Sequence, residues 1–234
     1  MSRSGIWAVI PAAGRGTRFG GDIPKQYLNV AGRPLIAHAL DALLAHPRVV
    51  GAIVALSADD TRWPGWTHWN GKPVLRCDGG GERADSVLAA LQALPPEVPA
   101  SALVLVHDAA RPNLHDTDLE RLIAAADLAH DGAILAAPVR DTLKRASDSD
   151  RIAATEPREG LWRAFTPQAF RRGALTAALQ QAQAAGIVVT DEAMAMERAG
   201  ARPMLVEGRE DNLKVTTSAD LALAEYLLTQ RVRT

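Results

Sequence analysis

The stretch IWAVIPAAGRGTRFGGDIPKQY, residues 6–27, joins a short apolar run to a long loop of glycines and basic residues. The run IWAVI, residues 6–10, has the length and composition of a buried strand. In the loop, glycines allow backbone N–H groups to approach an anion, while Arg18 and Lys25 add positive charge. The stretch therefore predicts a strand that leads into a polyphosphate-binding loop.

Two common phosphate loops do not fit these residues. A dinucleotide-binding fold requires G-x-G-x-x-G, and although Gly14 and Gly16 match, Phe19 occupies the third glycine position. A P-loop requires G-x-x-x-x-G-K-[ST], and although Gly16 and Gly21 have that spacing, Asp22 follows in place of lysine. The loop is therefore a polyphosphate loop of another kind.

The rest of the chain alternates between strand-like and helix-like segments. Apolar or β-branched runs of strand length are separated by segments whose apolar spacing is near 3.6 residues. This pattern indicates an α/β fold with a Rossmann-like, doubly wound, mostly parallel sheet. Ligands bind at the carboxyl ends of the strands in such sheets, which directs attention to the loops 11–27 and 107–112. The expected strands are 6–10, 49–56, 72–77, 102–107 and 132–138, and the expected helices are 34–46, 83–94 and 116–130.

A polar segment, residues 139–165, interrupts this pattern. Its apolar residues are single and scattered, so we expect an extended arm within one domain that spans residues 1–234. An arm that cannot bury itself packs against another chain, which predicts a homodimer. After the arm we expect helices at 168–185, from Asp191 and at 218–228, with short strands at 186–190 and 203–207.

Composition excludes several classes of function. The formal net charge of -1 provides no basic field for a nucleic-acid backbone, so no nucleic-acid partner is expected. No apolar run approaches the roughly 20 residues that cross a bilayer, so no membrane association is expected. The start, MSRSG, is too short for a signal peptide, and the single cysteine, Cys77, fits a reducing compartment. We therefore expect a cytoplasmic protein.

Two further loops contain residues suited to nucleotide chemistry. HDAARP, residues 107–112, follows an aliphatic strand, and Asp108 there can reach a Mg²⁺ that bridges phosphate oxygens. Capping of the next helix is the alternative role for this carboxylate. GGGERADSV, residues 79–87, places three glycines before a helix, and a plain turn is the alternative to a ligand loop.

The stretch PAAGRGTRFGGDIPKQYLNVAGRPLIAH, residues 11–38, resembles the signature loop of nucleotidylyltransferases that join an NTP to a sugar or polyol phosphate. It is similar in particular to the 2-C-methyl-D-erythritol 4-phosphate cytidylyltransferases of the non-mevalonate isoprenoid pathway. Other segments resemble that family in the same order, so the resemblance spans nearly the whole chain and is weakest over 57–71. These segments are RCDGGGERADSV (76–87), VHDAARP (106–112), AAPVRDTLK (136–144), LWRAFTPQAF (161–170), VVTDEAMAMERAG (188–200) and DNLKVTTSADLALAE (211–225).

The resemblance implies that CTP donates a cytidylyl group to 2-C-methyl-D-erythritol 4-phosphate and releases pyrophosphate, without a covalent intermediate. It also implies that Mg²⁺ or another divalent cation binds at Asp108. Because Thr142 and Arg158 lie in the arm, they are expected to serve the neighbouring subunit of a homodimer. The implied catalytic residues are Arg18, Lys25 and Lys214; the implied nucleotide contacts are Pro11, Ala12, Ala13, Gly14, Gly16, Gly80, Arg83, Ser86 and Ala109; and the implied substrate contacts are Arg111, Thr142, Arg158 and Thr216.

Three alternatives stay open at this point. A cytidylyltransferase for another polyol phosphate, such as ribitol 5-phosphate, shares much of this pattern. A sugar-nucleotide-dependent glycosyltransferase is suggested by the D-x-D at 148–150, although a solvated turn at the tip of the arm explains it better. A catalytically silent nucleotide-binding protein is the third. Trp63, Trp66 and Trp69 have no functional interpretation, and no fused cyclase domain is expected after the last helix.

Overall fold

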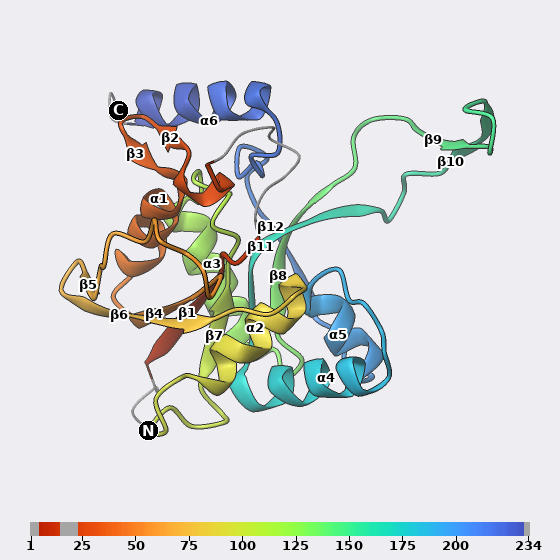
Figure 1. Ribbon diagram of the computed structural model, residues 1–234. Coiled ribbons are helices and arrows are strands. Elements are labelled where there is room, and N and C mark those ends of the chain that lie inside the picture. Colours follow the sequence, from red (N-terminus) through yellow and green to blue (C-terminus); the bar gives the residue numbers. More distant parts are fainter. Residues whose placement is uncertain (1–4, 15–22, 232–234) are drawn as a thin grey trace.

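The computed structural model describes residues 5–14 and 23–231. Within these residues the centre is a sheet of eight strands in the order β12-β8-β11-β7-β1-β4-β6-β5 (Figure 1). β11 runs antiparallel to both of its neighbours and β5 antiparallel to β6, while the other pairs are parallel. The predicted mostly parallel sheet is therefore confirmed. The strands are β1 (Ile6–Pro11), β4 (Val49–Leu56), β5 (His68–Trp69), β6 (Lys72–Asp78), β7 (Leu103–Val106), β8 (Ala133–Pro138), β11 (Trp162–Arg171) and β12 (Met204–Glu207).

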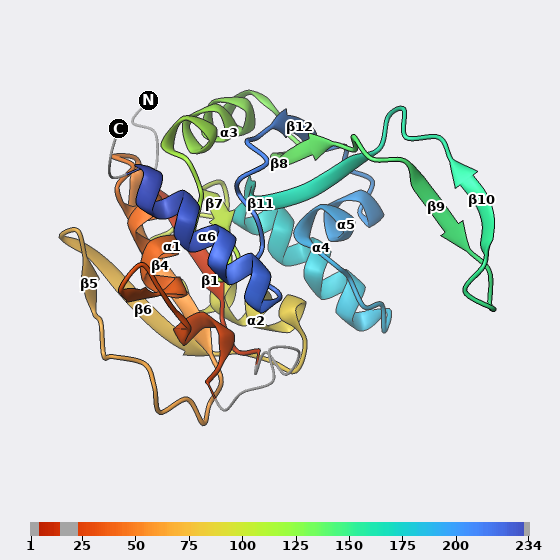
Figure 2. The same cartoon turned by 90° about the horizontal axis from the view of Figure 1, so that it is seen from above.

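Helices cover both faces of this sheet, as a doubly wound fold requires (Figure 2). On one face lie α1 (Leu35–Leu44) and α3 (Asp116–Leu128). The opposite face is covered by α2 (Arg83–Gln92), α4 (Arg172–Ala184) and α5 (Glu192–Arg198). No helix among the described residues combines the length and apolar character that crossing a membrane requires. The last helix, α6 (Ser218–Arg231), packs over the small hairpin of β2 (Asn29–Val30) and β3 (Arg33–Pro34).

β1 divides the apolar core into two halves because its side chains alternate between the two faces of the sheet. Ile6, Ala8 and Ile10 pack into the cluster formed with α1 and α3. Trp7 and Val9 pack into the cluster formed with α2, α4 and α5. Burial of each large apolar side chain stabilises the fold by about 1.5–3 kcal/mol. The carboxyl end of β1 is therefore held rigidly from both sides where the phosphate loop begins.

The arm protrudes from the body of the molecule, with β9 (Leu143–Ala146) and β10 (Ile152–Glu156) paired near its end (Figure 1). The D-x-D motif lies in the exposed turn between these strands, as expected, and Asp150 has a φ of 55°. The C-terminal end of the 139–165 segment differs from the prediction, because its last four residues belong to β11 of the central sheet. Phe165 is buried there, so the extended arm ends before Trp162.

The prediction of a helix at 168–185 was wrong at its start. β11 continues to Arg171, and α4 begins only at Arg172. Residues 168–171 pair with β7, so central-sheet hydrogen bonds override their helix-compatible composition.

The predicted strand at 186–190 was also wrong. Gly186, at φ 65°, ends α4, and Ile187 N–H donates to the carbonyl of Ala182 at 2.9 Å, which is a Schellman-type helix end. The backbone here therefore caps a helix, and Val188 is left 70% exposed.

Candidate active site

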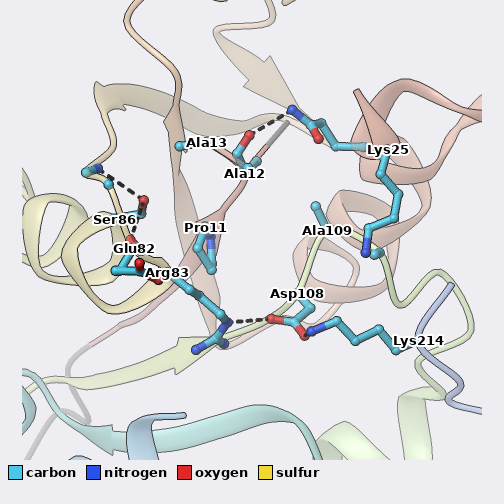
Figure 3. A pocket seen from close by; sticks show the side chains of 15 residues that line it. Pro11, Ala12, Ala13, Lys25, Glu82, Arg83, Ser86, Asp108, Ala109 and Lys214 are labelled. Atoms are coloured by element: carbon cyan, nitrogen blue, oxygen red, sulfur yellow. Dashed lines mark hydrogen bonds and ion pairs between the residues drawn. The ribbon is translucent and has the colours of Figure 1, made fainter. Parts of the chain in front are cut away.

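A cavity of about 320 Å³ opens at the carboxyl ends of β1 and β7, where the two loops singled out in the sequence meet (Figure 3). Three segments far apart in the sequence complete its walls: η2 (Lys25–Tyr27), the start of α2, and the loop before α6. Its position fits the rule that ligands bind at the carboxyl ends of parallel strands. The lining residues are Pro11, Ala12, Ala13, Gly14, Lys25, Gln26, Gly80, Gly81, Glu82, Arg83, Ser86, Asp108, Ala109, Ala110 and Lys214.

Lys25 lies in a short helical turn that is anchored on both sides. The buried Gln26 donates through Nε2 to the carbonyl of Ala12 at 2.8 Å, which ties the turn to the end of β1. The Tyr27 hydroxyl donates to Asp60 Oδ2 at 2.9 Å, and burial together with this carboxylate raises the pKa of Tyr27. The lysine side chain therefore extends into the cavity from a fixed backbone (Figure 3).

Asp108 is the centre of a compact charge cluster. Its Oδ1 accepts from Arg83 Nε at 2.9 Å, and its Oδ2 lies 2.8 Å from Lys214 Nζ and 3.9 Å from Arg111 Nε. Burial alone would raise the pKa of Asp108, but the three cations hold that pKa well below its usual range. The carboxylate is therefore ionised, and it concentrates basic side chains on one wall of the cavity.

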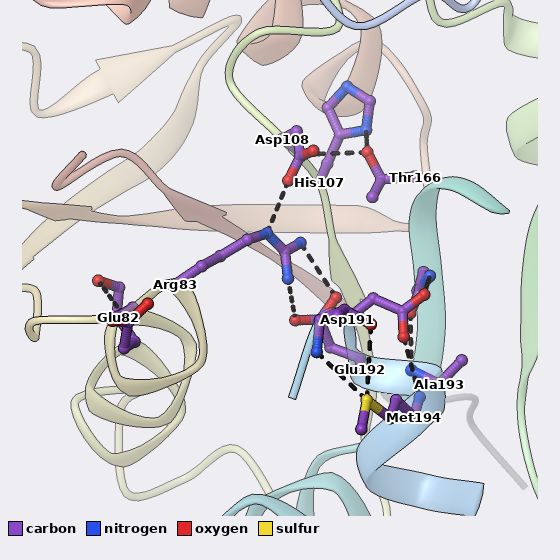
Figure 4. A network of polar contacts seen from close by, with 12 residues as sticks. Glu82, Arg83, His107, Asp108, Thr166, Asp191, Glu192, Ala193 and Met194 are labelled. Atoms are coloured by element: carbon purple, nitrogen blue, oxygen red, sulfur yellow. Dashed lines mark hydrogen bonds and ion pairs between the residues drawn. The ribbon is translucent and has the colours of Figure 1, made fainter. Parts of the chain in front are cut away.

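Arg83 is held on its other side by Glu192, the first residue of α5 (Figure 4). Arg83 Nη1 and Nη2 donate to Glu192 Oε1 and Oε2 at 2.6 and 3.1 Å. Burial lowers the pKa of Arg83, but the carboxylates of Glu192 and Asp108 raise it further and keep it above its usual range. All three nitrogens of this guanidinium therefore donate to carboxylates.

The backbone of the 107–112 loop is fixed by a buried relay that determines the tautomer of His107. Asp108 N–H donates to Thr166 Oγ1 at 3.0 Å, so the hydroxyl is free to donate to His107 Nδ1 at 3.0 Å. His107 Nε2 then carries the hydrogen that goes to the carbonyl of Arg111 at 3.0 Å. Burial lowers the pKa of His107 to about 4, so the ring is neutral at pH 7. His107 and Thr166 together thus fix the backbone of the 107–112 loop on both sides of Asp108.

Glycines before α2 allow close packing beside the cavity. A Cβ on Gly79 would lie 2.5 Å from the Cβ of Ala13, and a Cβ on Gly80 would lie 2.2 Å from the Cβ of Asp85. Gly80 N–H donates to Ser86 Oγ at 3.1 Å, so these two predicted nucleotide contacts support each other. This close packing therefore requires glycine at positions 79 and 80.

The remaining predicted substrate contacts within the body lie beside the cluster. Arg111 Nη1 donates to the carbonyl of Asn212 at 2.7 Å, and its guanidinium lies 5.2 Å from the centre of the Phe165 ring. Val215 N–H donates to the carbonyl of Ala110 at 2.8 Å and so places Lys214 over the same loop. The Thr216 hydroxyl donates to Asp220 Oδ2 at 2.6 Å, at the start of α6.

Of the described residues that were predicted to bind substrate, four do not line this cavity: Arg111, Thr142, Arg158 and Thr216. Thr142 and Arg158 lie in the arm, and neither of these described residues lines the cavity. Arg158 donates instead to the backbone carbonyl of Arg140. Gly16 and Arg18 lie outside the described residues.

Four supporting residues carried no signal that separated them from ordinary polar residues in the sequence. Glu192 and Gln168 are buried, and Gln168 Oε1 accepts from Ala193 N–H at 2.9 Å, which fixes the start of α5. Thr166 and Gln26 were overlooked in the same way. Glu192 follows the N-cap residue Asp191, and an acid there suits any helix start, so its position does not distinguish it either.

Comparisons with known proteins identify the family of this chain. The family model "IspD: 2-C-methyl-D-erythritol 4-phosphate cytidylyltransferase" matches residues 6–230. A 2-C-methyl-D-erythritol 4-phosphate cytidylyltransferase of Stenotrophomonas maltophilia (strain K279a) is 65% identical over 226 residues, covering 97% of both chains. One from Xanthomonas campestris pv. campestris (strain 8004) is 63% identical over 228 residues, covering 97% of this chain and 86% of that protein.

Solved structures agree as well. A crystal structure of 4-diphosphocytidyl-2C-methyl-D-erythritol synthase is 36% identical, with a TM-score of 0.81 over 97% of this chain and 100% of that chain. The Francisella tularensis 2-C-methyl-D-erythritol 4-phosphate cytidylyltransferase is 32% identical, with a TM-score of 0.83 over 96% of this chain and 100% of that chain. With its cavity, its cluster at Asp108 and these similarities along almost its full length, the chain belongs to the 2-C-methyl-D-erythritol 4-phosphate cytidylyltransferase family.

Proposed function

We propose that this chain transfers the cytidylyl group of CTP to 2-C-methyl-D-erythritol 4-phosphate. A phosphate oxygen of the acceptor forms a bond to the α-phosphorus of CTP in line with the leaving group. The bond from that phosphorus to the oxygen that bridges to the β-phosphate breaks, and pyrophosphate leaves. The attacking oxygen is already anionic, so the reaction needs positioning and charge stabilisation rather than a general base.

The cluster at Asp108 is the observation that carries this proposal. Lys214 and Arg83 contact that carboxylate, and Lys25 reaches into the same cavity from η2. Cations in a partly enclosed cavity stabilise the charge that develops on a transferred phosphoryl group. In the proposed reaction Lys25, together with Arg18, holds the leaving pyrophosphate, and Lys214 stabilises the crowded α-phosphate.

The other predicted site residues divide between the two substrates. The carboxyl end of β1 and the turn before α2 hold the nucleotide. Gly80, Arg83 and Ser86 lie beside the base, and Ala109 lies on the ribose side. Arg111 and Thr216 face the acceptor. The other proposed nucleotide contacts are Pro11, Ala12, Ala13, Gly14 and Gly16.

A divalent cation, Mg²⁺ in the simplest case, fits Asp108. Among the described residues no group of three or more His, Cys, Asp or Glu side chains could hold a metal by itself. Mg²⁺ bound mainly by nucleotide phosphates and water needs few protein ligands, and one carboxylate on the cavity wall supplies such a ligand. Lys214, whose side chain is 41% exposed, can leave Oδ2 to make room. When bound, the ion neutralises charge on the triphosphate.

The arm makes the enzyme a homodimer in this proposal. The chain forms one nucleotidylyltransferase domain, and its arm, within 139–165, presents Thr142 and Arg158 to the acceptor site of the partner. Support comes from the arm's projection away from the body and from Ile152, which is 69% exposed on β10 (Figure 1). The single cysteine, Cys77, supports a cytoplasmic location.

Pyrophosphate release tests the choice of acceptor. The purified protein is incubated with CTP and a divalent cation, and with either 2-C-methyl-D-erythritol 4-phosphate or ribitol 5-phosphate. We expect release with the first acceptor and at least tenfold less with the second. Release with ribitol 5-phosphate alone would make the chain a cytidylyltransferase for another polyol phosphate.

A further inference from the structure

Glu192 is a buried carboxylate that lies outside the cavity yet is bound to a cavity residue. Its side chain is 1% exposed, and it is not among the residues that line the cavity. Both of its oxygens accept from the two terminal nitrogens of Arg83, at 2.6 and 3.1 Å (Figure 4). A planar guanidinium bound through both terminal nitrogens has a fixed orientation.

Glu192 is itself held in place from a third element. Asp191 Oδ1 accepts from Met194 N–H at 2.9 Å, and Asp191 Oδ2 accepts from Gln168 Nε2 at 2.9 Å. Gln168 Oε1 accepts from Ala193 N–H, so β11 fixes the first turn of α5 (Figure 4). The orientation of Arg83 is therefore set by the central sheet through α5.

The carboxylates around Arg83 determine whether its guanidinium can bind a triphosphate. With Nε donating to Asp108 and both terminal nitrogens donating to Glu192, the guanidinium has no unused bidentate edge for a phosphate. This cluster contains three cations and two carboxylates. The cations are Arg83, Arg111 and Lys214, and the carboxylates are Asp108 and Glu192. Removal of the Glu192 charge leaves three cations beside one carboxylate, Asp108. The two terminal nitrogens of Arg83 are then free to bind phosphate.

We propose that Glu192 is a positioning residue. It keeps Arg83 beside the nucleoside of CTP and prevents the Arg83 guanidinium from binding the triphosphate. Glu192→Gln retains the size of the side chain but replaces one acceptor oxygen with an amide that faces an Arg83 donor. The arginine then turns toward phosphate. The inference rests on the proposed function, because CTP is its nucleotide.

Calorimetric titration of the full-length protein with two probes tests this role. Glu192→Gln should weaken CTP binding about tenfold, a typical loss when a group that orients a ligand-binding side chain is changed. Binding of inorganic tripolyphosphate, which has no nucleoside, should stay unchanged or become tighter, because the cavity gains positive charge. Unchanged CTP affinity, or an equal loss for both probes, would overturn the proposal.

A double-mutant cycle shows whether Glu192 acts through Arg83. In an Arg83→Gln background, Glu192→Gln should change the CTP dissociation constant by less than about twofold, since the residue it orients is already absent. A further tenfold loss in that background would contradict the proposed route. If Glu192→Gln does not fold, Glu192→Asp replaces it, and its shorter carboxylate should weaken CTP binding about threefold without weakening tripolyphosphate binding. Unchanged CTP affinity in that variant would also overturn the proposal.

The chain contains a matched control at a distance from the cavity. Asp127 accepts from Arg48 Nη1 and Nη2 at 2.6 and 3.1 Å, the same fork geometry between α3 and the residue before β4. Asp127→Asn should leave the CTP dissociation constant within about twofold, and an equal loss there would refute a specific role for Glu192. Failure of the wild-type protein to bind CTP would instead refute the proposed function.

Discussion

Lys214 Nζ lies 2.8 Å from Asp108 Oδ2, so a basic side chain occupies the carboxylate to which a divalent cation is proposed to bind. Asp108 thereby holds Lys214 at the cavity before any nucleotide arrives. In the proposed exchange Lys214 leaves Oδ2 to the cation, while Arg83 Nε keeps its hydrogen bond to Oδ1. In this proposal Lys214 then contacts an anionic phosphate of the nucleotide beside Asp108.

Lys214→Ala should therefore lower kcat by about 100-fold or more, the usual loss when one stabilising group is removed from a charged transition state. Its side chain is 41% exposed, so the melting temperature should change little. Steady-state pyrophosphate release and thermal unfolding measure the two effects. A kcat within threefold of wild type would remove Lys214 from the proposed mechanism.

Complementation between two inactive variants tests whether the arm serves the partner. Lys25→Ala alone should lower kcat at least 100-fold, and Arg158→Ala should weaken acceptor binding while sparing CTP. If the arm acts in trans, each mixed dimer has one site with Lys25 in the body and Arg158 from the partner.

Random mixing should then restore roughly a quarter of the wild-type activity. The variants are unfolded and refolded together, and each variant treated alone serves as a control. Recovery no greater than the sum of the two separate activities would indicate that arm and body act within one chain.

Neutral His107 makes the protein less stable in acid. The unfolded state binds a proton near pH 6.5, whereas the folded state does so only near pH 4, because burial lowers the pKa of His107. As the pH falls from 7 to 5 the unfolded state takes up the proton, so stability declines by about 2 kcal/mol from this group.

Denaturant unfolding at both pH values measures this effect. His107→Asn should be less stable at pH 7, because Thr166 and the Arg111 carbonyl lose their ring partner. Its stability should nevertheless fall less steeply between pH 7 and pH 5 than that of the wild type. Parallel pH profiles for the two proteins would show that His107 does not stay neutral in the fold.

Gly80 and Gly81 offer a matched pair for testing the close packing before α2. A Cβ on Gly80 would lie 2.2 Å from the Cβ of Asp85, whereas a Cβ on Gly81 would meet nothing within 4 Å. Gly80→Ala should therefore lower the free energy of unfolding by about 1–3 kcal/mol, the usual effect of overpacking. Gly81→Ala should leave it within about 0.5 kcal/mol. Equal stability of the two variants would argue against this local geometry.

The sequence predicted those features that depend on local pattern. The strand expected at 49–56 is β4 with the same bounds, because a continuous apolar run buried on both faces leaves little choice. The loops at 11–27 and 107–112 were identified because glycines and charges directly after strands mark the carboxyl edge of a sheet. The cavity joins the described part of the first loop to the second.

Features that depend on distant pairing were missed. Gln168 was assigned to a helix, but its backbone pairs with Val106 and Ile134 in neighbouring strands. Glu192 meets Arg83 across 109 residues of sequence, and nothing adjacent to either residue indicates the other. The Trp63–Trp66–Trp69 series stays without a functional role, and its rings stack edge to face with centres 5.2 and 4.6 Å apart.

The most direct test of the central claim is ³¹P NMR of the reaction of the wild-type protein with CTP, Mg²⁺ and 2-C-methyl-D-erythritol 4-phosphate. The account predicts free pyrophosphate and, in equal amount, two mutually coupled resonances from a diphosphate that joins cytidine to the polyol. It also predicts no CMP, because the acceptor phosphate rather than water attacks the α-phosphorus. Loss of CTP to CMP and pyrophosphate, or an unchanged spectrum with folded protein supplied with Mg²⁺, would contradict the proposed transfer.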